Sequence, residues 1–241
     1  MTKAQLGTVD HDPQHLVEEK RGLISAGHER AVLLILVFGS SVWSLVGAHD
    51  LRMWALEVLP FVPCWIVVIG SLRRFPLSRL AFRLLSIFVL LHLVGAHYLY
   101  SEVPFGSWVQ EILELERNPF DRWAHLSFGV MGAIVARELM LRTSPLRPGP
   151  WLSFLSFSCV MCGSAIYEIL EWRAWVFVNL VRPGTDLLGA QGDIWDSQWD
   201  ISLAALAAIL GLLFLRGIHD ASIAEIETEN SVVSHGLRTT Q

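Results

Sequence analysis

Six long apolar stretches, separated by short polar segments, make up most of the chain. They lie near residues 31–48, 53–72, 80–100, 122–142, 151–176 and 198–217. As an α-helix rising about 1.5 Å per residue, each stretch can cross a hydrocarbon core of about 30 Å. Runs this continuous exclude the alternating pattern of barrel strands, and lipid admits only helices or closed barrels. The pattern predicts an all-α, polytopic membrane protein built as a six-helix transmembrane bundle.

Polar segments flank this membrane domain, which we place at residues 29–218. Residues 1–28 are expected to form a mobile polar arm and residues 219–241 a polar tail, because neither contains a spanning apolar run. Residues 31–48 fit a span better than a signal peptide, since the polar region before them is too long. No linker or internal repeat indicates a second domain.

Composition agrees with a membrane location and limits the partners. The chain is 53% hydrophobic and 17% charged, with a mean hydropathy of +0.46, values that are unusual for a soluble domain. A net charge of -5 without a basic stripe argues against a nucleic-acid partner. Membrane lipid is therefore the expected surrounding partner, and a homo-oligomer stays open.

The charged residues of the polar segments predict the topology. Basic residues occupy the segments before the first span, after the second and after the fourth, namely Lys20, Arg21, Arg30, Arg73, Arg74, Arg79, Arg142 and Arg147. Acidic residues dominate the alternate segments. By the positive-inside rule, the basic segments and both termini are cytoplasmic, and the acidic segments face out.

Two local patterns add detail to the helices. Pro60 and Pro63 fall inside the second span and predict a kink close to Glu57, because each proline removes a backbone donor. Between the third and fourth spans, residues 101–120 show apolar positions at helical spacing opposite glutamates. This segment is expected to form a short amphipathic helix at the membrane surface.

Polar residues, most of them ionisable, gather at the outer ends of five predicted spans. In chain order, the group comprises Glu57, His92, His97, Asp121, Arg122, His125, Tyr167, Glu168, Glu171, Asp193, Asp196, Gln198 and Asp200. An ionised group near the bilayer centre costs about 2.5 to 3.5 kcal/mol or more, so clustering at one depth indicates a shared site. Spacings of three and four residues let one helix present two ligands to an ion. Carboxylate with imidazole suits zinc, manganese or iron.

Structural roles compete with a metal for parts of this group. Asp121 could cap the fourth helix, and His92 could be a hydrogen-bonded core residue. Ion pairs that tie helices together are a further explanation, with Glu168–Arg173 and Asp196–Arg122 as the candidate pairs. These roles leave a surplus of acid, which protons or a metal would neutralise.

Three motifs resemble the YjdF-like family of bacterial inner-membrane proteins, a domain of unknown function. They are NPFDRWAHLSFG, SAIYEILEW and GAQGDIWDSQWDISLAALAAILG, and the resemblance covers roughly residues 30–217. The family pattern is matched here by Asp121, Arg122, His125, Glu168, Glu171, Trp172, Gly192, Asp193, Trp195, Asp196, Gln198 and Asp200. The resemblance implies a multi-pass protein of the bacterial inner (plasma) membrane, but no activity. The D-R-x-x-H element is also similar to VanZ-like membrane proteins.

The first functional hypothesis is a membrane-embedded hydrolase or transferase acting on a lipid-linked or cell-envelope substrate at the outer face. A divalent metal (Zn, Mn or Fe) would be bound by His125, Glu168, Asp193, Asp196 and Asp200. The expected catalytic residues are Glu171 or Asp121 as proton acceptor and Arg122 as phosphate ligand. Glu57, His97, Tyr167 and Gln198 would complete the pocket.

Two alternatives stay open. A cation- or proton-coupled transporter would use the same acids at its outer mouth and needs a matching gate at the inner end. That end shows little beyond Glu138 and arginines such as Arg137 and Arg142, which we expect to extend toward the membrane surface. No inverted repeat supports transport. A non-catalytic scaffold would use the polar cluster only to hold helices together.

Overall fold

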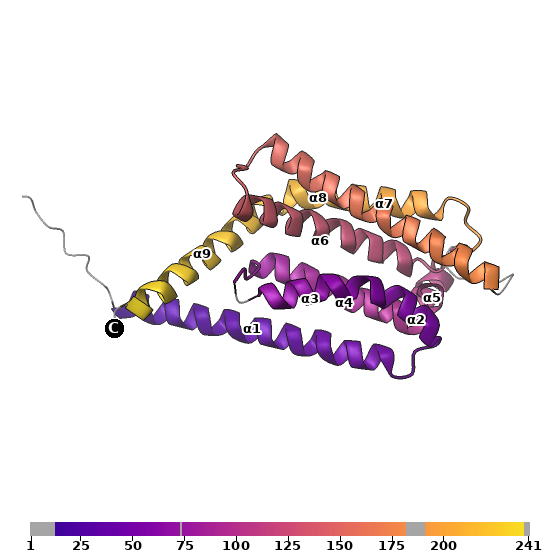
Figure 1. Ribbon diagram of the computed structural model, residues 1–241, viewed down its shortest axis with the longest axis horizontal. Coiled ribbons are helices and arrows are strands. Elements are labelled where there is room, and N and C mark those ends of the chain that lie inside the picture. Colours follow the sequence, from indigo (N-terminus) through magenta and orange to yellow (C-terminus); the bar gives the residue numbers. More distant parts are fainter. Residues whose placement is uncertain (1–12, 73, 182–190, 239–241) are drawn as a thin grey trace, which may run out of the picture.

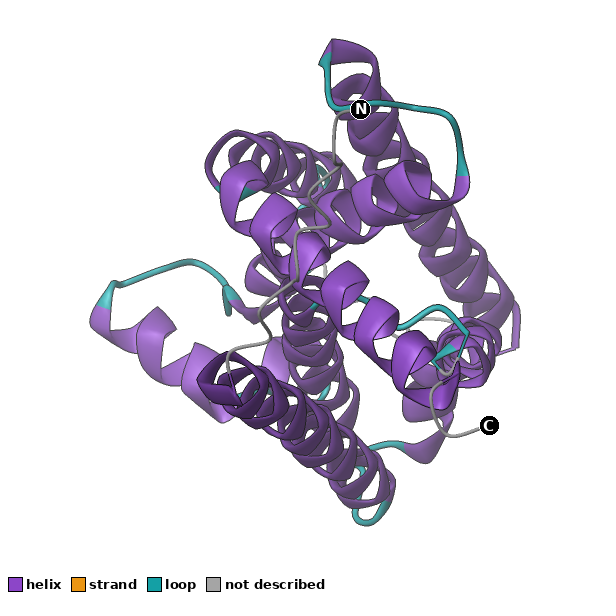
Figure 2. Cartoon of the chain, turned by 90° about the vertical axis from the view of Figure 1, so that its left-hand side faces the viewer, coloured by secondary structure: helices purple, strands orange, loops and turns teal. Residues whose placement is uncertain are grey.

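The protein is described by a computed structural model that covers residues 13–72, 74–181 and 191–238, with side chains for 27–72, 74–180 and 191–228. Its helices are α1 (Pro13–Leu45), α2 (Leu51–Val58), α3 (Val62–Ser71), α4 (Arg79–Tyr98), α5 (Pro104–Ile112), α6 (Phe120–Thr143), α7 (Pro150–Val181), α8 (Asp196–Phe214) and α9 (Arg216–Arg238) (Figure 1). The described residues contain no strand, as the end-on view shows (Figure 2). The predicted all-α class is confirmed.

Within the part of the chain that the structure describes, six helical stretches are long and apolar enough to cross a membrane: Gly27–Leu45, Leu51–Ser71, Arg79–Tyr98, Phe120–Thr143, Pro150–Leu180 and Asp196–Phe214. Each overlaps one predicted span. The second is broken where its prolines predict, because a 3-10 turn at Leu59–Phe61 separates α2 from α3. The expected surface helix after the third span is α5. The polytopic bundle predicted from the sequence is therefore confirmed.

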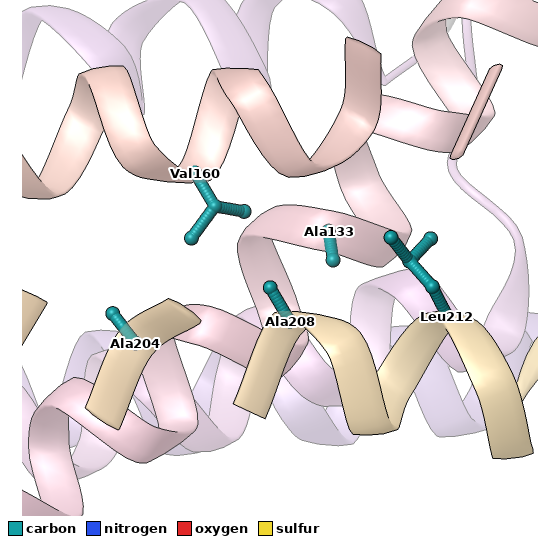
Figure 3. Packing of buried hydrophobic residues seen from close by; sticks show 5 residues of the cluster. All are labelled: Ala133, Val160, Ala204, Ala208 and Leu212. Carbon is teal, nitrogen blue, oxygen red and sulfur yellow. The ribbon is translucent and has the colours of Figure 1, made fainter. Parts of the chain in front are cut away.

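Helices α6 and α8 approach closely because small residues face each other. A Cβ added to Gly129 would lie 2.2 Å from the carbonyl oxygen of Ala204. Further along, Ala133, Ala208, Leu212 and Val160 of α7 fill the contact (Figure 3). Small residues drive helix association in lipid by letting backbones pack tightly. One helical turn before Gly129 and Ala204 lie His125 and Asp200, so this contact brings their side chains together.

The expected polar arm and tail are largely helical where the structure describes them. Helix α1 begins at Pro13, and α9 diverges from the bundle toward the same side as the start of α1 (Figure 1). The first turns of α9 are nevertheless packed, because His219, Ile223 and Ile226 are buried and Ser222 Oγ accepts a hydrogen bond from the Leu80 amide at 3.1 Å. The packed unit thus extends beyond residue 218. Residues 1–12 and 239–241 lie outside the described chain.

Candidate metal centre

Three carboxylates from three helices surround His125 at the end of the bundle where α6 and α8 begin. The Nε2 atom of His125 lies 3.7 Å from Asp121 Oδ1, 3.6 Å from Glu168 Oε1 and 4.0 Å from Asp200 Oδ2. Ligand atoms of Asp121, His125 and Asp200 all lie within 4.8 Å of one another. All four residues are buried. We call Asp121, His125, Glu168 and Asp200 the His125 cluster.

The distances within the His125 cluster suit a shared cation better than direct hydrogen bonds. Protein hydrogen bonds from nitrogen to oxygen usually span about 2.7 to 3.2 Å, less than these separations. Ligands about 2.1 Å from a tetrahedral zinc ion lie about 3.4 Å apart, close to the separations seen here. Glu168 Oε1 and Asp200 Oδ1 are buried without a hydrogen-bond partner. Because burying such an atom unsatisfied is costly, these two oxygens point to a ligand.

Arg117, in the loop before α6, places a buried positive charge beside the cluster. Its Nη2 atom lies 3.6 Å from Asp121 Oδ2, and its Nη1 atom also forms an ion pair with Asp196. Burial lowers the pKa of Arg117, but the hydrogen bond and charge of Asp196, together with other carboxylates, outweigh this and hold the pKa above its usual value. Arg117 is therefore a fixed cation that neutralises part of the acid surplus.

The structure separates two of the predicted metal ligands, Asp193 and Asp196, from those that surround His125. Asp193 lies 3.6 Å from Arg117 and accepts a hydrogen bond of 3.2 Å from Arg122. Asp196 pairs with Arg117, one turn before Asp200 on α8. Two expected ligands are thus engaged by arginines. Asp121, expected as a proton acceptor, instead lies among the ligand-type groups.

A loop contact that the sequence did not indicate positions Arg117. Asn118 and Gln191 exchange two hydrogen bonds, from the Asn118 amide to Gln191 Oε1 at 2.8 Å and from Gln191 Nε2 to the Asn118 carbonyl at 3.1 Å. Asn118 Oδ1 also accepts from the Phe120 amide at 3.0 Å. The N-cap position of α6 is Pro119, without a side-chain capping bond, so Asp121 does not cap this helix. The contact ties the loop before α6 to the segment before α8.

A second polar group contains His92 and Glu57. Tyr167 donates a hydrogen bond of 2.7 Å to Glu57 Oε2, and His92 contacts the Tyr100 hydroxyl at 2.6 Å and the Glu57 carbonyl at 3.2 Å. Burial raises the pKa of the Tyr100 phenol well above its usual value, and nearby carboxylates raise it further. The phenol therefore stays protonated and donates to His92 Nδ1. His92 is the hydrogen-bonded core residue that one interpretation of the sequence predicts.

Two cavities adjoin these groups. The first, of about 240 Å³, is lined by Asp121 and His125 and also by His92 and Tyr167. The second, of about 210 Å³, is lined by Glu57, Tyr167 and Glu171. Glu171 thus lines the second cavity together with Glu57 and Tyr167.

Two expected pocket residues face elsewhere. The ring of His97 stacks on Trp43 at a centroid distance of 4.1 Å, and its Nδ1 lies 3.1 Å from the Ser44 carbonyl. His97 follows His92 by five residues, about 140° around α4, so it faces α1 instead of the cavity. Gln198 is exposed because it lies two residues, about 200°, from Asp196 on α8. The expected pair Glu168–Arg173 is not formed, since Arg173 lies over the Trp172 ring at 5.8 Å.

A separate polar network lies at the other end of the bundle. Glu138 accepts hydrogen bonds from the Ser78 amide at 2.8 Å, from Arg142 at 2.7 Å and from His219 at 3.1 Å. Arg137 contacts His219 Nδ1 at 2.9 Å and donates to Asp220 at 2.7 Å. We call this group the Glu138 network; its members are Ser78, Arg137, Glu138, Arg142, His219 and Asp220. Arg137 and Arg142 are held inside it, so the expectation that they extend toward the surface is wrong.

Comparison with known proteins places the chain in a family. Residues 29–221 match the family of predicted membrane proteins DUF2238. The chain belongs to this family. It is also 35% identical, over 178 residues, to the inner membrane protein YjdF of Escherichia coli K12, a match that covers 74% of this chain and 84% of that protein. No solved structure matches. These matches do not extend to the VanZ-like proteins.

The matches and the six apolar helices support an integral, multi-pass protein of the bacterial inner membrane. The family description carries no activity.

Proposed function

We propose that this protein is a metal-dependent hydrolase or transferase acting on a phosphate-bearing, lipid-linked or envelope substrate at the outer face of the inner membrane. The proposal depends on one observation. Asp121, His125 and Asp200 bring three buried ligand atoms within 4.8 Å, and one carboxylate oxygen each of Asp200 and Glu168 is buried without a hydrogen-bond partner. One imidazole with carboxylates is a donor set for Zn, Mn or Fe.

The surrounding residues supply the functions that such chemistry needs. A bound divalent metal would lower the pKa of a coordinated water to about 7. Glu168 is placed to accept the water proton, because its Oε1 faces His125 and lacks a hydrogen donor. Arg122 has 32% of its side chain exposed and forms an ion pair with Asp193. Its planar guanidinium suits a substrate phosphate that would replace Asp193.

The middle of the bundle favours an enzyme over a transporter. Cation transfer would need polar groups that connect the His125 cluster with the Glu138 network. Between them, α6, α7 and α8 are joined by the apolar contact of Ala133, Val160, Ala204 and Ala208, packed against Phe128 (Figure 3). This layer separates the two polar ends along the most closely packed helices.

The test is metal-dependent phosphate release by purified protein in detergent, with isoprenyl diphosphate and diacylglycerol phosphate as probes. We expect the parent protein to release phosphate only with Zn²⁺, Mn²⁺ or Fe²⁺ present, and Asp200→Asn and His125→Ala to be inactive. Asp50→Asn is the matched control, because Asp50 caps α2 away from the cluster and asparagine also caps helices. Metal-independent release, or equal activity in Asp200→Asn, would contradict the proposal.

A further inference from the structure

We infer that the 240 Å³ cavity beside the His125 cluster binds a hydrocarbon chain of the substrate, which enters sideways from the membrane between α3 and α7. The inference names the substrate class of the proposed enzyme and rests on that proposal for its catalytic meaning. Binding of the chain itself requires no metal.

The lining of the cavity suits an amphipathic molecule. Most of the wall is apolar, including Pro60, Phe61, Phe88, Phe128, Ile166 and Leu170. Asp121 and His125 also line the cavity, so a bound chain would bring an attached polar group to the His125 cluster. The volume of 240 Å³ is below the range of about 300 to 1,000 Å³ for sites that enclose a whole small molecule. The cavity therefore fits part of one chain.

The cavity opens toward lipid. Cys64 on α3 is exposed, and Ile166 and Leu170 on α7 are 53% and 48% exposed. All three line the cavity and belong to membrane-spanning segments, so the molecules that reach this opening are lipids. No residue of α2 or α3 is buried. The second span contacts α7 through the hydrogen bond from Tyr167 to Glu57. It also contacts α7 through the Phe61 ring, whose centroid lies 5.6 Å from that of the Tyr167 ring.

Ser164 marks the inner wall of the cavity. It is 1% exposed, and its hydroxyl is buried without a hydrogen-bond partner while the residue lines the cavity. Bulk lipid cannot reach a residue so deeply buried. A probe on a lipid chain can label Ser164 only from inside the cavity, which gives a readout that ordinary lipid contact does not produce.

The experiment is photolabelling of the full-length protein in vesicles of phosphatidylethanolamine that carries a diazirine in the middle of one acyl chain. We expect labelling of Ser164, called the inner label, in addition to labelling of the lipid-facing Ile87, which is 50% exposed in the middle of α4. Gly163→Leu fills the cavity, since a Cβ at Gly163 would lie 3.1 Å from the Phe128 ring. It should lose the inner label and keep the label at Ile87. Gly39→Leu, at an open position on α1, should behave as the parent.

Two further variants keep the test decisive. Cys64→Trp blocks the opening from its exposed side without entering the core, and it should also lose the inner label. Asp200→Asn should keep the inner label, because the chain site does not need the metal. Inner labelling without metal-dependent activity would overturn the proposed function and support the chain site. Labelling confined to lipid-facing residues in the parent, or an inner label that persists in Gly163→Leu and Cys64→Trp, would overturn the chain site.

Discussion

The His125 cluster and the Glu138 network are both buried groups of charged residues in one membrane bundle, yet their partners differ. Both oxygens of Glu138 accept hydrogen bonds, and the arginines of the network face acceptors. In the His125 cluster, three carboxylates face one imidazole, and two of their oxygens have no partner. A complete network holds helices together, whereas an incomplete one is suited to a ligand.

The two groups also differ in how they join the helices. The Glu138 network links the start of α4, the end of α6 and α9. The Ser78–Glu138 bond joins residues that are 60 positions apart in the sequence, and the His219–Glu138 bond joins residues that are 81 positions apart. The His125 cluster depends on the close contact of α6 and α8 at Gly129, one turn away. Substitutions should therefore separate stability at one end from metal binding at the other.

The largest effect on stability is expected from Glu138→Ala. It removes the carboxylate that pairs with the buried His219 and with Arg142, and breaking such a group costs about 3 to 5 kcal/mol of unfolding free energy. Denaturant unfolding in detergent measures the loss. Glu225→Ala is the control, because the Glu225 side chain is 54% exposed and its pair with Arg79 spans 3.8 Å, so the pair should be worth less than about 1 kcal/mol. Equal losses in the two variants would contradict a structural role for the network.

Metal should stabilise the protein through the His125 cluster. At a free concentration of 100 times Kd, Zn²⁺ should raise the unfolding free energy by about 2.7 kcal/mol. Asp200→Asn should remove this gain. Without metal it should unfold no earlier than the parent, because it removes one of several crowded acids. Thermal unfolding with and without a chelator checks both statements, and a metal-free Asp200→Asn that is much less stable than the parent would argue for a structural cluster.

Gly129→Val should weaken both stability and metal binding. The added side chain meets the Ala204 carbonyl and separates α6 from α8, at a cost of about 1 to 3 kcal/mol. Gly39→Val, where nothing lies within 4 Å of the added Cβ, is the lipid-facing control. In Gly129→Val, the melting temperature measured by thermal unfolding and the metal affinity measured by titration should both decrease. Unchanged metal affinity in a destabilised protein would show that the cluster does not depend on this contact.

The smallest effect concerns alkaline pH. The pKa of Tyr100 is raised in the folded protein, so above pH of about 10 the unfolded chain loses this proton first. The contribution of Tyr100 to stability is complete below that pH and decreases as the pH rises, by up to about 1.4 kcal/mol per pH unit. Tyr100→Phe should flatten this decrease in unfolding experiments from pH 9 to 11. An unchanged slope would contradict the buried, protonated phenol.

Much of the fold could be predicted from the sequence, because lipid imposes the length and continuity of each span. The break at Pro60 and the gathering of acids at one end followed from the same reasoning. Facing directions could not be derived, since they depend on how each helix is rotated against its neighbours. For this reason the expectation that His97 and Gln198 line the pocket is wrong. Both residues lie at the same end of the bundle as the His125 cluster, but their side chains face away from it.

Partners supplied by loops were also beyond the sequence. No helical spacing marks Arg117 in its loop, and nothing in the spacing of Asn118 and Gln191 indicates that they bond across 73 positions. Ser78 and His219 likewise gave no periodic signal for the Glu138 network. Such contacts arise from the tertiary arrangement, which residue spacing along one helix does not encode.

Elemental analysis of the purified protein tests the central claim most directly. The parent, Asp200→Asn and Glu138→Ala would be purified without chelator, and bound Zn, Mn and Fe would be measured per chain. We predict a stoichiometric divalent metal in the parent and in the folded fraction of Glu138→Ala, and its loss in Asp200→Asn. A parent protein without stoichiometric metal, or Asp200→Asn with as much metal as the parent, would contradict the account.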